Sequence, residues 1–490
     1  MNTKLLKQKI LDLAIRGKLT QQLKSDGTAR ELLEQISSKV SSSSSTLSSP
    51  RRRGSPSSSA AKTIIPLDKS EAPFEIPANW EWVRLGDVAK KITDGTHHSP
   101  VNLETGDFMY VTAKNIKDDG IHLENITYVS SDTHKEIFAR CNPEKGDVLL
   151  IKDGATTGVV TVNNLEEPFS LLSSVALLKL GSSIESWYLA FVIRSTLFNQ
   201  MIRSQMKGVG ITRVTLKQIE SFAFPLPPLA EQQRIVEKIQ EAFAEIDSIE
   251  NNKELLKTHI KQARQKILDL AIHGKLVPQN KADEPAIVLL ERITRDNPHY
   301  EKIGLDEVPF DIPENWCWTK LPYLCRTPIT DGTHNSPPNT DEGEYFYITA
   351  KNIKNNGIDL SNVSYVSKEV HEAIVSRCRP EKGDVLLTKD GTIGNATVNN
   401  LDDDFSLLSS VALIKPHSSV LSWYIVFCLR SSYLQKLMKN DAKGTALKRV
   451  ILSQINNFLV PLPPLAEQSR IVAKIKELFY TLDQMERNLV

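Results

Sequence analysis

Two kinds of hydrophobic pattern alternate along the chain, and the first is a seven-residue repeat. No Gly or Pro interrupts 231–272, so a single helix of about 60 Å is possible there at about 1.5 Å per residue. Apolar residues occupy two heptad positions in this stretch and near the C-terminus, which is typical of a coiled coil. The predicted coiled-coil spacer positions are Ile235, Ile239, Ile246, Ile249, Leu256, Ile260, Ile267, Leu270, Ile471, Ile475, Leu478 and Leu482.

The second pattern consists of short apolar or β-branched runs separated by Asp-Gly, Asn-Asn and Gly-Asp turns. GDVLLIKDG at 146–154 and SLLSSVALLK at 170–179 are examples, and such runs predict strands. The apolar stretch 186–202 and its copy at 422–438 predict one helix each. We therefore expect an α+β fold with two mostly-β domains, separated by long antiparallel coiled-coil helices.

The chain is an internal duplication. ITDGTHHSP at 92–100 returns as ITDGTHNSP at 329–337, and PLPPLAEQ at 225–232 returns at 461–468. KILDLAIRGKL at 9–19 also returns, as KILDLAIHGKL, but 257 residues later instead of 236 or 237. The excess falls in a Ser-rich tract that is present in the first copy only.

The two chain ends match the middle of the long helix. By the repeat, Val490 corresponds to Glu254 and Met1 to Thr258. The C-terminal helix thus stops where the N-terminal helix begins. We expect these two helices together to mimic the central helix and to pack antiparallel against it, in a circular, pseudo-two-fold arrangement.

These patterns divide the chain into six segments. The Ser-rich tract has no apolar periodicity and cannot bury a core, so it reads as a disordered linker; its Arg51–Arg53 run is either solvated or a phosphate contact. In order, the segments are an N-terminal helical region that pairs with the C-terminal helix (1–36), the linker (37–69), the first globular domain (70–228), the central helical spacer (229–306), the second globular domain (307–464) and the C-terminal helical spacer (465–490).

The repeated PLPPLAEQ motif allows two interpretations. It resembles a PxxP ligand, which would bind an aromatic groove of another protein. Its identical position before both long helices favours a stiff joint between each domain and its helix.

Composition excludes several classes of protein. The 490 residues are 40% hydrophobic and 24% charged, with a net charge of +1, so the chain lacks the strongly basic coat of a protein held to nucleic acid by charge alone. Five cysteines without a CxxC pair argue against a disulfide framework and a zinc site. The N-terminus lacks the features of a signal peptide and no apolar run is long enough for a bilayer, so we expect a cytoplasmic protein.

Catalytic signatures are missing from the sequence. There is no GxxxxGK[ST] phosphate loop, no GxGxxG after a strand, no HExxH and no aromatic-flanked Asn/Asp-Pro-Pro box of an amino-methyltransferase. Clustered carboxylates with a strand lysine, which a nuclease would need, are not found either. The sequence therefore predicts binding rather than catalysis, with no metal ligand.

Four polar or basic loops recur in both copies and are the candidate binding residues. Each alone could be an ordinary turn or a strand end with solvated lysines, but together they favour nucleic acid, because such groups contact phosphates and base edges. The candidates are Thr93, Thr96, His97, His98, Lys114, Asn115, Lys117, Lys152, Thr156, Lys207 and Arg213 in the first copy, and Thr330, Thr333, His334, Asn335, Lys351, Asn352, Lys354, Lys389, Thr392, Lys443, Lys448 and Arg449 in the second.

Two similar α+β domains separated by helices, each ending in PLPPLAEQ and an RIV–KI helix, resemble the specificity subunit of a type I restriction–modification system. The resemblance covers essentially the whole chain. It implies that each domain is a target recognition domain for half of a bipartite, interrupted site in double-stranded DNA, and that the helices set the gap and dock two modification (methyltransferase) subunits. It also implies that the chain has no catalytic residue, that restriction subunits join through the complex, and that S-adenosylmethionine, ATP and Mg belong to partner subunits.

The near identity of the copies predicts the symmetry of the target. Proteins with two-fold symmetry match two-fold DNA sites, so we expect a near-palindrome. Departures should follow the differences between the copies: His98 against Asn335, 155–159 against 392–395, and 209–212 against 445–447. With its near-zero net charge, the chain alone should bind DNA weakly and lose affinity steeply with salt. The alternatives are a fused methyltransferase or nuclease, and a structural coiled-coil adaptor with two protein-binding domains.

Overall fold

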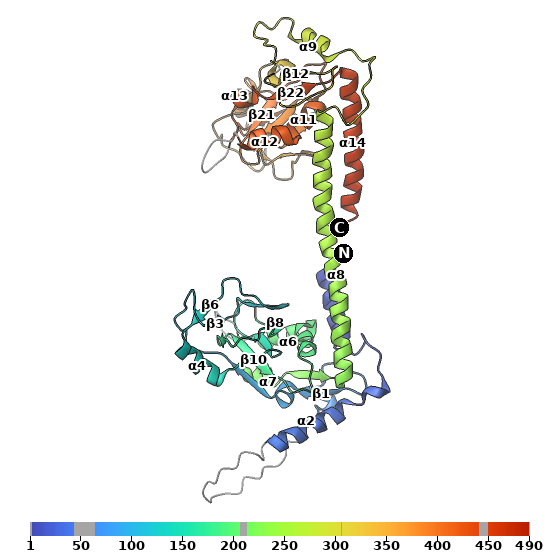
Figure 1. The fold of residues 1–490 in the computed structure, drawn as a ribbon. Coiled ribbons are helices and arrows are strands. Elements are labelled where there is room, and N and C mark those ends of the chain that lie inside the picture. Colours follow the sequence, from blue (N-terminus) through green and yellow to red (C-terminus); the bar gives the residue numbers. More distant parts are fainter. Residues whose placement is uncertain (1, 44–63, 206–212, 305, 441–448, 490) are drawn as a thin grey trace, which may run out of the picture. The chain divides into compact units, whose positions relative to one another are not determined.

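A computed structural model describes residues 2–43, 64–205, 213–304, 306–440 and 449–489 (Figure 1). The chain separates into two compact units, Met1–Asn251 (unit 1) and Asn252–Val490 (unit 2). Helix α8 (Leu229–Ile272) is a single helix, as predicted, and contributes residues to both units. The circular relation predicted between the two copies stays a prediction.

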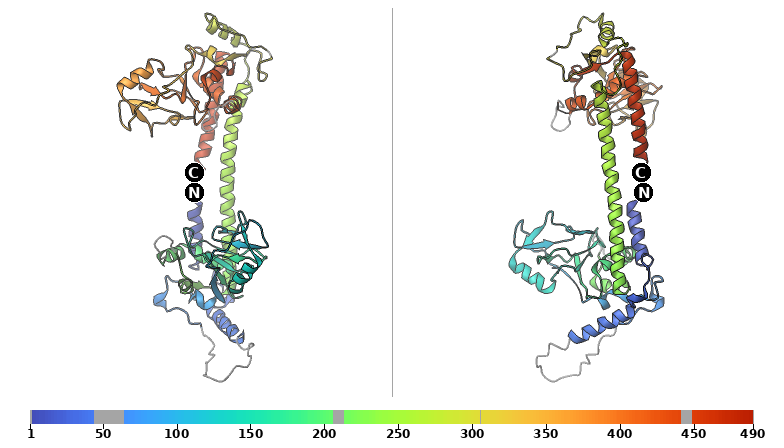
Figure 2. Two further views of the ribbon diagram at one scale, coloured as in Figure 1. Left: turned by 90° about the vertical axis from the view of Figure 1, so that its left-hand side faces the viewer. Right: turned by 45° about the vertical axis from the view of Figure 1, so that its right-hand side comes forward.

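Each unit pairs two antiparallel helices. In unit 1, α1 (Thr3–Ala14) lies beside the first half of α8, where Thr3 contacts Glu250 and Lys7 contacts Asp247 (Figures 1 and 2). In unit 2, α14 (Leu465–Arg487) lies beside the second half of α8, and Arg264 forms ion pairs with Asp483 at 2.6 Å and Glu486 at 2.9 Å. The predicted antiparallel packing is confirmed within each unit.

The heptad positions are buried unevenly. Those nearest the domains pack into the domain cores, whereas Ile249 and Leu256 are 48% and 41% exposed. Ile249 and Leu256 keep the heptad, but the helix that pairs with α8 in their own unit, α1 or α14, does not bury them. The buried positions are Ile235, Ile239, Ile246, Ile260, Ile471 and Ile475, and those of intermediate burial are Ile267, Leu270, Leu478 and Leu482.

Two isoleucines one turn apart on α8 should therefore respond differently to truncation. Ile246→Ala removes a buried side chain and should cost about 2–4 kcal/mol of unfolding free energy. Ile249→Ala alters an exposed side chain and should stay within about 0.5 kcal/mol. Denaturant unfolding of the two variants checks this, and equal losses would mean that the seam is closed around both residues.

The PLPPLAEQ motif joins each domain to its helix. Strand β11 (Ala223–Leu226) pairs with β1 (Glu81–Arg84), and α8 begins directly afterwards. The buried Glu231 carboxylate accepts hydrogen bonds from the Trp80 indole at 2.9 Å and the Gln22 amide at 2.6 Å. In unit 2, Glu467 accepts the same bonds from Trp316 and Gln279, and its burial raises the pKa of its carboxyl. These contacts support the interpretation as a stiff joint.

The remaining strands of unit 1 form two main sheets, and unit 2 repeats them. The first sheet is antiparallel and has the strand order β2 (Lys91–Asp94), β10 (Val175–Lys179), β7 (Val148–Ile151) and β8 (Val160–Val162). The second sheet has the order β6 (Thr127–Val129), β3 (Phe108–Val111) and β9 (Ser170–Leu171), and its strands β3 and β9 are parallel. A short hairpin pairs β4 (Ile116–Lys117) with β5 (Gly120–Ile121). The unit 2 equivalents are β13 (Thr330–Asp331), β21 (Val411–Ile414), β18 (Val385–Thr388) and β19 (Ala396–Val398); β17 (Ser364–Val366), β14 (Tyr345–Ile348) and β20 (Phe405–Leu407); β15 (Ile353–Lys354) with β16 (Gly357–Ile358); and β12 (Cys317–Lys320) with β22 (Leu459–Leu462).

The central strand β7 separates two hydrophobic cores of unit 1. Its residues alternate between two hydrophobic cores, because side chains of a strand point to opposite faces. Val148 and Leu150 pack with helix α5 (Ser186–Arg194), while Leu149 and Ile151 pack with the β3–β9 sheet. A run of four apolar residues is what a strand buried on both faces requires.

The predicted helix 186–202 is two helices. Helix α5 ends at Arg194, and α6 (Thr196–Gln205) starts after Ser195, which is extended. The carboxylate of Asp12 in α1 accepts hydrogen bonds from the amide and hydroxyl of Thr196, at 2.8 and 2.7 Å, and caps the new helix. The copy at 422–438 divides in the same way, into α11 (Ser422–Arg430) and α12 (Ser432–Asn440).

Helix α2 (Ala29–Ser43) continues past residue 36, where the linker was expected to begin. The described chain resumes at Ile64, which is buried in the unit 1 core; 44–63, including Arg51–Arg53, lie outside the described residues. In the part of the chain that is described, no helix is long and apolar enough to cross a membrane. The other helices are α3 (Leu85–Val88), α4 (Ser131–Arg140), α7 (Leu216–Glu220), α9 (Ala286–Thr294), α10 (Lys368–Val375) and α13 (Leu452–Ile455), with 3₁₀ turns at Lys24–Asp26, Lys69–Glu71 and Leu321–Leu324.

Candidate nucleic-acid interface

One short segment holds three of the candidate loops together. In unit 1 this hub is 172–174: Leu172 donates its amide to Val111, Ser173 to Thr96, and Ser174 accepts from the amide of Lys152. The distances are 3.1, 2.9 and 2.9 Å. In unit 2, 408–410 makes the same three bonds. The repeated FSLLSS sequence is therefore the strand end that positions the loops.

The backbone of the first loop packs very closely against the strand end that leads into the hub. A Cβ on Gly95 would lie 1.9 Å from the carbonyl oxygen of Leu171, and one on Gly332 would lie 1.8 Å from that of Leu407. Only glycine allows this approach of two backbones. The next residue, Thr96, uses its hydroxyl to close a small turn with the backbone of His98, so the side chain of His98 projects from a fixed position.

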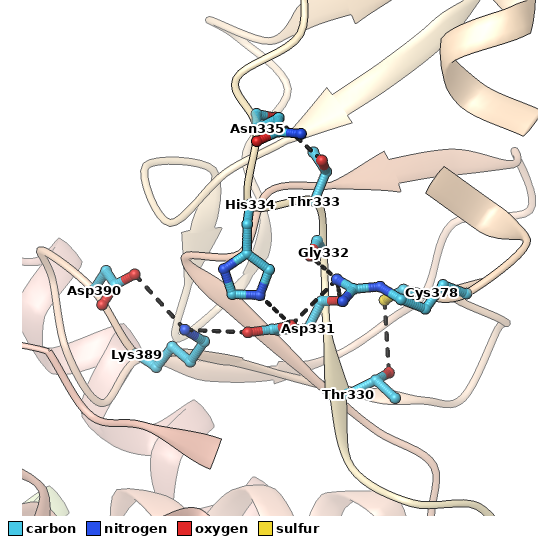
Figure 3. Close-up of polar contacts among 10 residues, drawn as sticks. Thr330, Asp331, Gly332, Thr333, His334, Asn335, Cys378, Lys389 and Asp390 are labelled. Atoms are coloured by element: carbon cyan, nitrogen blue, oxygen red, sulfur yellow. Dashed lines mark hydrogen bonds and ion pairs between the residues drawn. The ribbon is translucent and has the colours of Figure 1, made fainter. Parts of the chain in front are cut away.

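A buried carboxylate gathers basic side chains on and beside the loops. In unit 2, Asp331 lies 3.3 Å from the ammonium of Lys389, 3.2 Å from the imidazole of His334 and 3.4 Å from the guanidinium of Arg377 (Figure 3). The Arg377 guanidinium also contacts the carbonyl of Gly332. In unit 1, Asp94 has the equivalent neighbours, which are Lys152, His97 and Arg140.

The structure changes the interpretation of Lys152 and Lys389. Both are only 6% exposed, and each lies between two carboxylates of its own domain. Their charges are therefore neutralised inside the fold and are not presented to a phosphate. Thr93 is also buried, in β2, and the partly buried Thr330 hydroxyl contacts the thiol of Cys378.

Asn115 and Asn352 are structural as well. The Asn115 side-chain oxygen accepts from the amide and hydroxyl of Thr112, and its nitrogen donates to the carbonyl of His122 at 3.1 Å. Asn352 makes the equivalent bonds to Thr349 and Asp359. Both amides are therefore engaged in closing their own loop and are not free to reach a base edge.

The remaining candidates divide by exposure. Thr96 and Thr333 are partly buried, and Lys207, Lys443 and Lys448 lie outside the described residues. Arg213 and Arg449 are exposed, and each forms a backbone bridge with the aspartate of the third loop, Asp153 or Asp390. The exposed side chains are His97, His98, Lys114, Lys117, Thr156 and Arg213 in unit 1, and His334, Asn335, Lys351, Lys354, Thr392 and Arg449 in unit 2. The two sets are equivalent, position by position.

Two pairs of arginines near the loops were not among the candidates predicted from the sequence. Arg140 and Arg377 complete the charge clusters, and the repeated RC–PEKGD sequence contains them. Arg194 and Arg430 are mostly buried and donate to the carbonyls of Val160 and Ala396. Burial lowers the pKa of Arg430 to about 10, which still leaves it charged at neutral pH. The arginine that ends the apolar helix in both copies was the available signal.

The fold and the duplicated polar loops define a tandem binding protein, and comparisons give its family. Residues 77–258 and 313–489 match the family described as "Type I restriction modification DNA specificity domain". The chain therefore belongs to the type I restriction–modification specificity family and carries two copies of its DNA specificity domain.

Individual relatives agree with this assignment. The EcoEI and EcoAI specificity subunits of Escherichia coli are 23% and 24% identical, over 99% of this chain and 90% of each relative. The EcoBI specificity subunit of Escherichia coli is 28% identical over 59% of this chain, and the chain spans 58% of that relative. A solved chain from "Structural basis underlying complex assembly and conformational transition of the type I R-M system" shares the fold, with a TM-score of 0.56, 20% identity, and coverage of 85% of this chain and 94% of that one.

Proposed function

We propose that this chain is the non-catalytic specificity subunit of a cytoplasmic type I restriction–modification complex. Each globular domain reads one half of a bipartite, interrupted site in double-stranded DNA. The observation that carries the proposal is the duplicated loop cluster, in which the same backbone hub presents an equivalent set of exposed polar and basic side chains in both copies. Such groups contact phosphates and base edges.

We also propose that the target is a near-palindrome. The exposed sets differ at His98 and Asn335, which occupy the same place in the turn after Thr96 and Thr333. An imidazole and an amide offer different hydrogen-bonding groups to a base edge. The two half-sites should therefore be closely related and differ where these residues read.

The helices provide the docking surface in this proposal. Each unit leaves large apolar residues uncovered on its helices: Leu5 and Ile249 in unit 1, and Leu255, Leu256 and Met485 in unit 2. Exposed apolar groups of this kind favour protein contacts. They would dock two methyltransferase subunits, which bring S-adenosylmethionine, while restriction subunits bring the ATP and Mg chemistry.

DNA binding by the assembled complex tests the proposal. The chain should copurify with the methyltransferase subunit of its own system, and the complex should bind duplex DNA with an affinity that falls steeply with salt. The chain alone should bind more weakly. A complex that assembles fully but has no affinity for DNA would instead favour the structural adaptor, and methyl transfer by the purified chain with S-adenosylmethionine would favour an enzyme.

A further inference from the structure

A polar hollow beside the second loop of unit 1 is lined in part by residues whose buried hydroxyls have no hydrogen-bond partner within the described chain. The hollow has a volume of about 550 Å³, and Tyr110, Ser174, Lys114 and Lys117 are among its lining residues. Tyr110 is 3% exposed, and neither its hydroxyl nor that of Ser174 has a hydrogen-bond partner among the described residues. A buried hydroxyl without a partner is costly, so a ligand that accepts hydrogen bonds would satisfy both groups.

The charge of the hollow favours an anion. Lys114 and Lys117 are exposed, and no carboxylate of the described chain pairs with either ammonium. Glu124 is the one acidic lining residue, and its carboxylate lies 3.5 Å from the imidazole of His122. Burial raises the pKa of Tyr110 to about 12, so its hydroxyl stays protonated and can donate at neutral pH.

The free groups that are charged or buried are donors, which favours a phosphate over a base, although the exposed amides of Asn102 and Asn125 also line the hollow. Ammonium groups only donate, and the free hydroxyls can turn to do so, whereas a base edge presents both donors and acceptors. The Asn115 amide, which could have read a base, is already bonded within its loop. We infer that this hollow binds a phosphate of the DNA backbone next to the half-site, an assignment that rests on the proposed function.

The second copy retains the tyrosine and the two lysines, whereas the hydroxyl oxygen of Ser410, the counterpart of Ser174, accepts a hydrogen bond from the amide of Ala350 at 3.1 Å. Tyr347 is 3% exposed and its hydroxyl is also unpartnered, and Lys351 and Lys354 are exposed at the positions of the two lysines. The rim differs, since Asp359 replaces His122 and Ser361 replaces Glu124. Donors that are kept while the rim changes are consistent with a ligand that is the same at every DNA sequence.

Three variants of the intact complex with the methyltransferase subunit test the inference. The double variant Lys114→Ala/Lys117→Ala should reduce the slope of log affinity against log salt by about 0.9, because one phosphate is no longer neutralised. Its affinity for cognate and unrelated duplexes should fall by the same factor, and the methylated motif should not change. Lys145→Ala, which removes an exposed ammonium already paired with Glu166, is the matched control and should leave the slope unchanged.

Tyr110→Phe separates binding from folding. It removes a buried hydroxyl that has no partner in the described part of the free protein, so stability should not fall and should rise slightly, while affinity for DNA should fall about tenfold because the hydrogen bond to a charged group can no longer form. Equal affinities of wild type and Tyr110→Phe, or of the double variant and Lys145→Ala, would overturn the inference.

Duplexes with single neutral methylphosphonate linkages identify the ligand. Wild type should be weakened by one linkage near the half-site, and the lysine double variant should be insensitive to that linkage alone. Inorganic phosphate at matched ionic strength should compete no better than chloride; specific competition would assign the hollow to a free anion. A changed methylation motif would assign it to a base, and a wild-type complex without DNA affinity would remove the proposed function itself.

Discussion

Asp94→Asn should destabilise unit 1 by about 3 kcal/mol, because it leaves a buried ammonium with less compensation. The Asp94 side chain is 3% exposed and lies 3.4 Å from the Lys152 ammonium, which would retain only Asp153 as an ion-pair partner. Arg140 and His97 would lose the same carboxylate, so only the backbone bonds of the hub would still hold the first and third loops together. Denaturant unfolding monitored by hydrogen exchange in each unit measures the effect.

The duplication provides a matched comparison. Asp331→Asn should produce the same loss in unit 2 and leave unit 1 unchanged, since Asp331 holds the equivalent cluster. Asp132→Asn alters a 97% exposed carboxylate beside Lys135 and should change stability by less than about 0.5 kcal/mol. If Asp94→Asn proves as mild as Asp132→Asn, the cluster does not hold the loops.

Gly95→Ala should be still more damaging, with a loss of more than about 3 kcal/mol from overpacking. The added Cβ would lie 1.9 Å from the backbone carbonyl oxygen of Leu171, and backbone cannot move aside as a flexible side chain can. The loop that carries His97 and His98 would have to leave the hub. We expect unfolding of unit 1 at lower denaturant and loss of methylation by the complex.

Gly181→Ala is the control for this substitution. A Cβ there would meet only the end of the Lys90 side chain, at 3.7 Å, so stability should change by less than about 0.5 kcal/mol. Comparable losses from Gly95→Ala and Gly181→Ala would show that the first loop is not constrained by the hub.

The long helix and the joints could be predicted because their signals are local. An uninterrupted stretch of helix-compatible residues became α8, and a motif repeated before each long helix became the joint at Glu231 and Glu467. The heptad repeat predicted that a helix forms, but it did not predict which of its apolar residues a second helix would bury. Ile249 and Leu256 keep the repeat, although no helix of their own unit buries them. Periodicity records which face is apolar, not what lies against it.

The errors arise where partners are distant in sequence. The helix 186–202 breaks because Asp12, 184 residues away, caps Thr196. Lys152 seemed available for phosphate because Asp94, its buried partner, belongs to another loop. Asn115 seemed free because its loop closure needs the carbonyl of His122 beyond the next turn. In each case the residue type was informative and its partner was not visible from the sequence.

The two copies also separate structure from recognition. Positions that build the hub are the same in both, including Gly95 and Gly332, and Asp94 and Asp331. Positions that project from it differ at His98 and Asn335. A protein that reads two related half-sites would use this division, because a common scaffold keeps the loops in place while single side chains change the base that is preferred.

The methylation motif of the assembled complex tests most directly whether this chain reads two related half-sites. The chain is expressed with its methyltransferase subunit in a host without DNA methylation, and modified adenines are mapped by single-molecule sequencing, for wild type and for His98→Asn. We expect an interrupted motif with inverted, near-identical halves, of which His98→Asn changes only one. Unrelated halves would contradict the two-fold argument, an unchanged motif would remove His98 from the readout, and the absence of any motif from an assembled complex would contradict the specificity role.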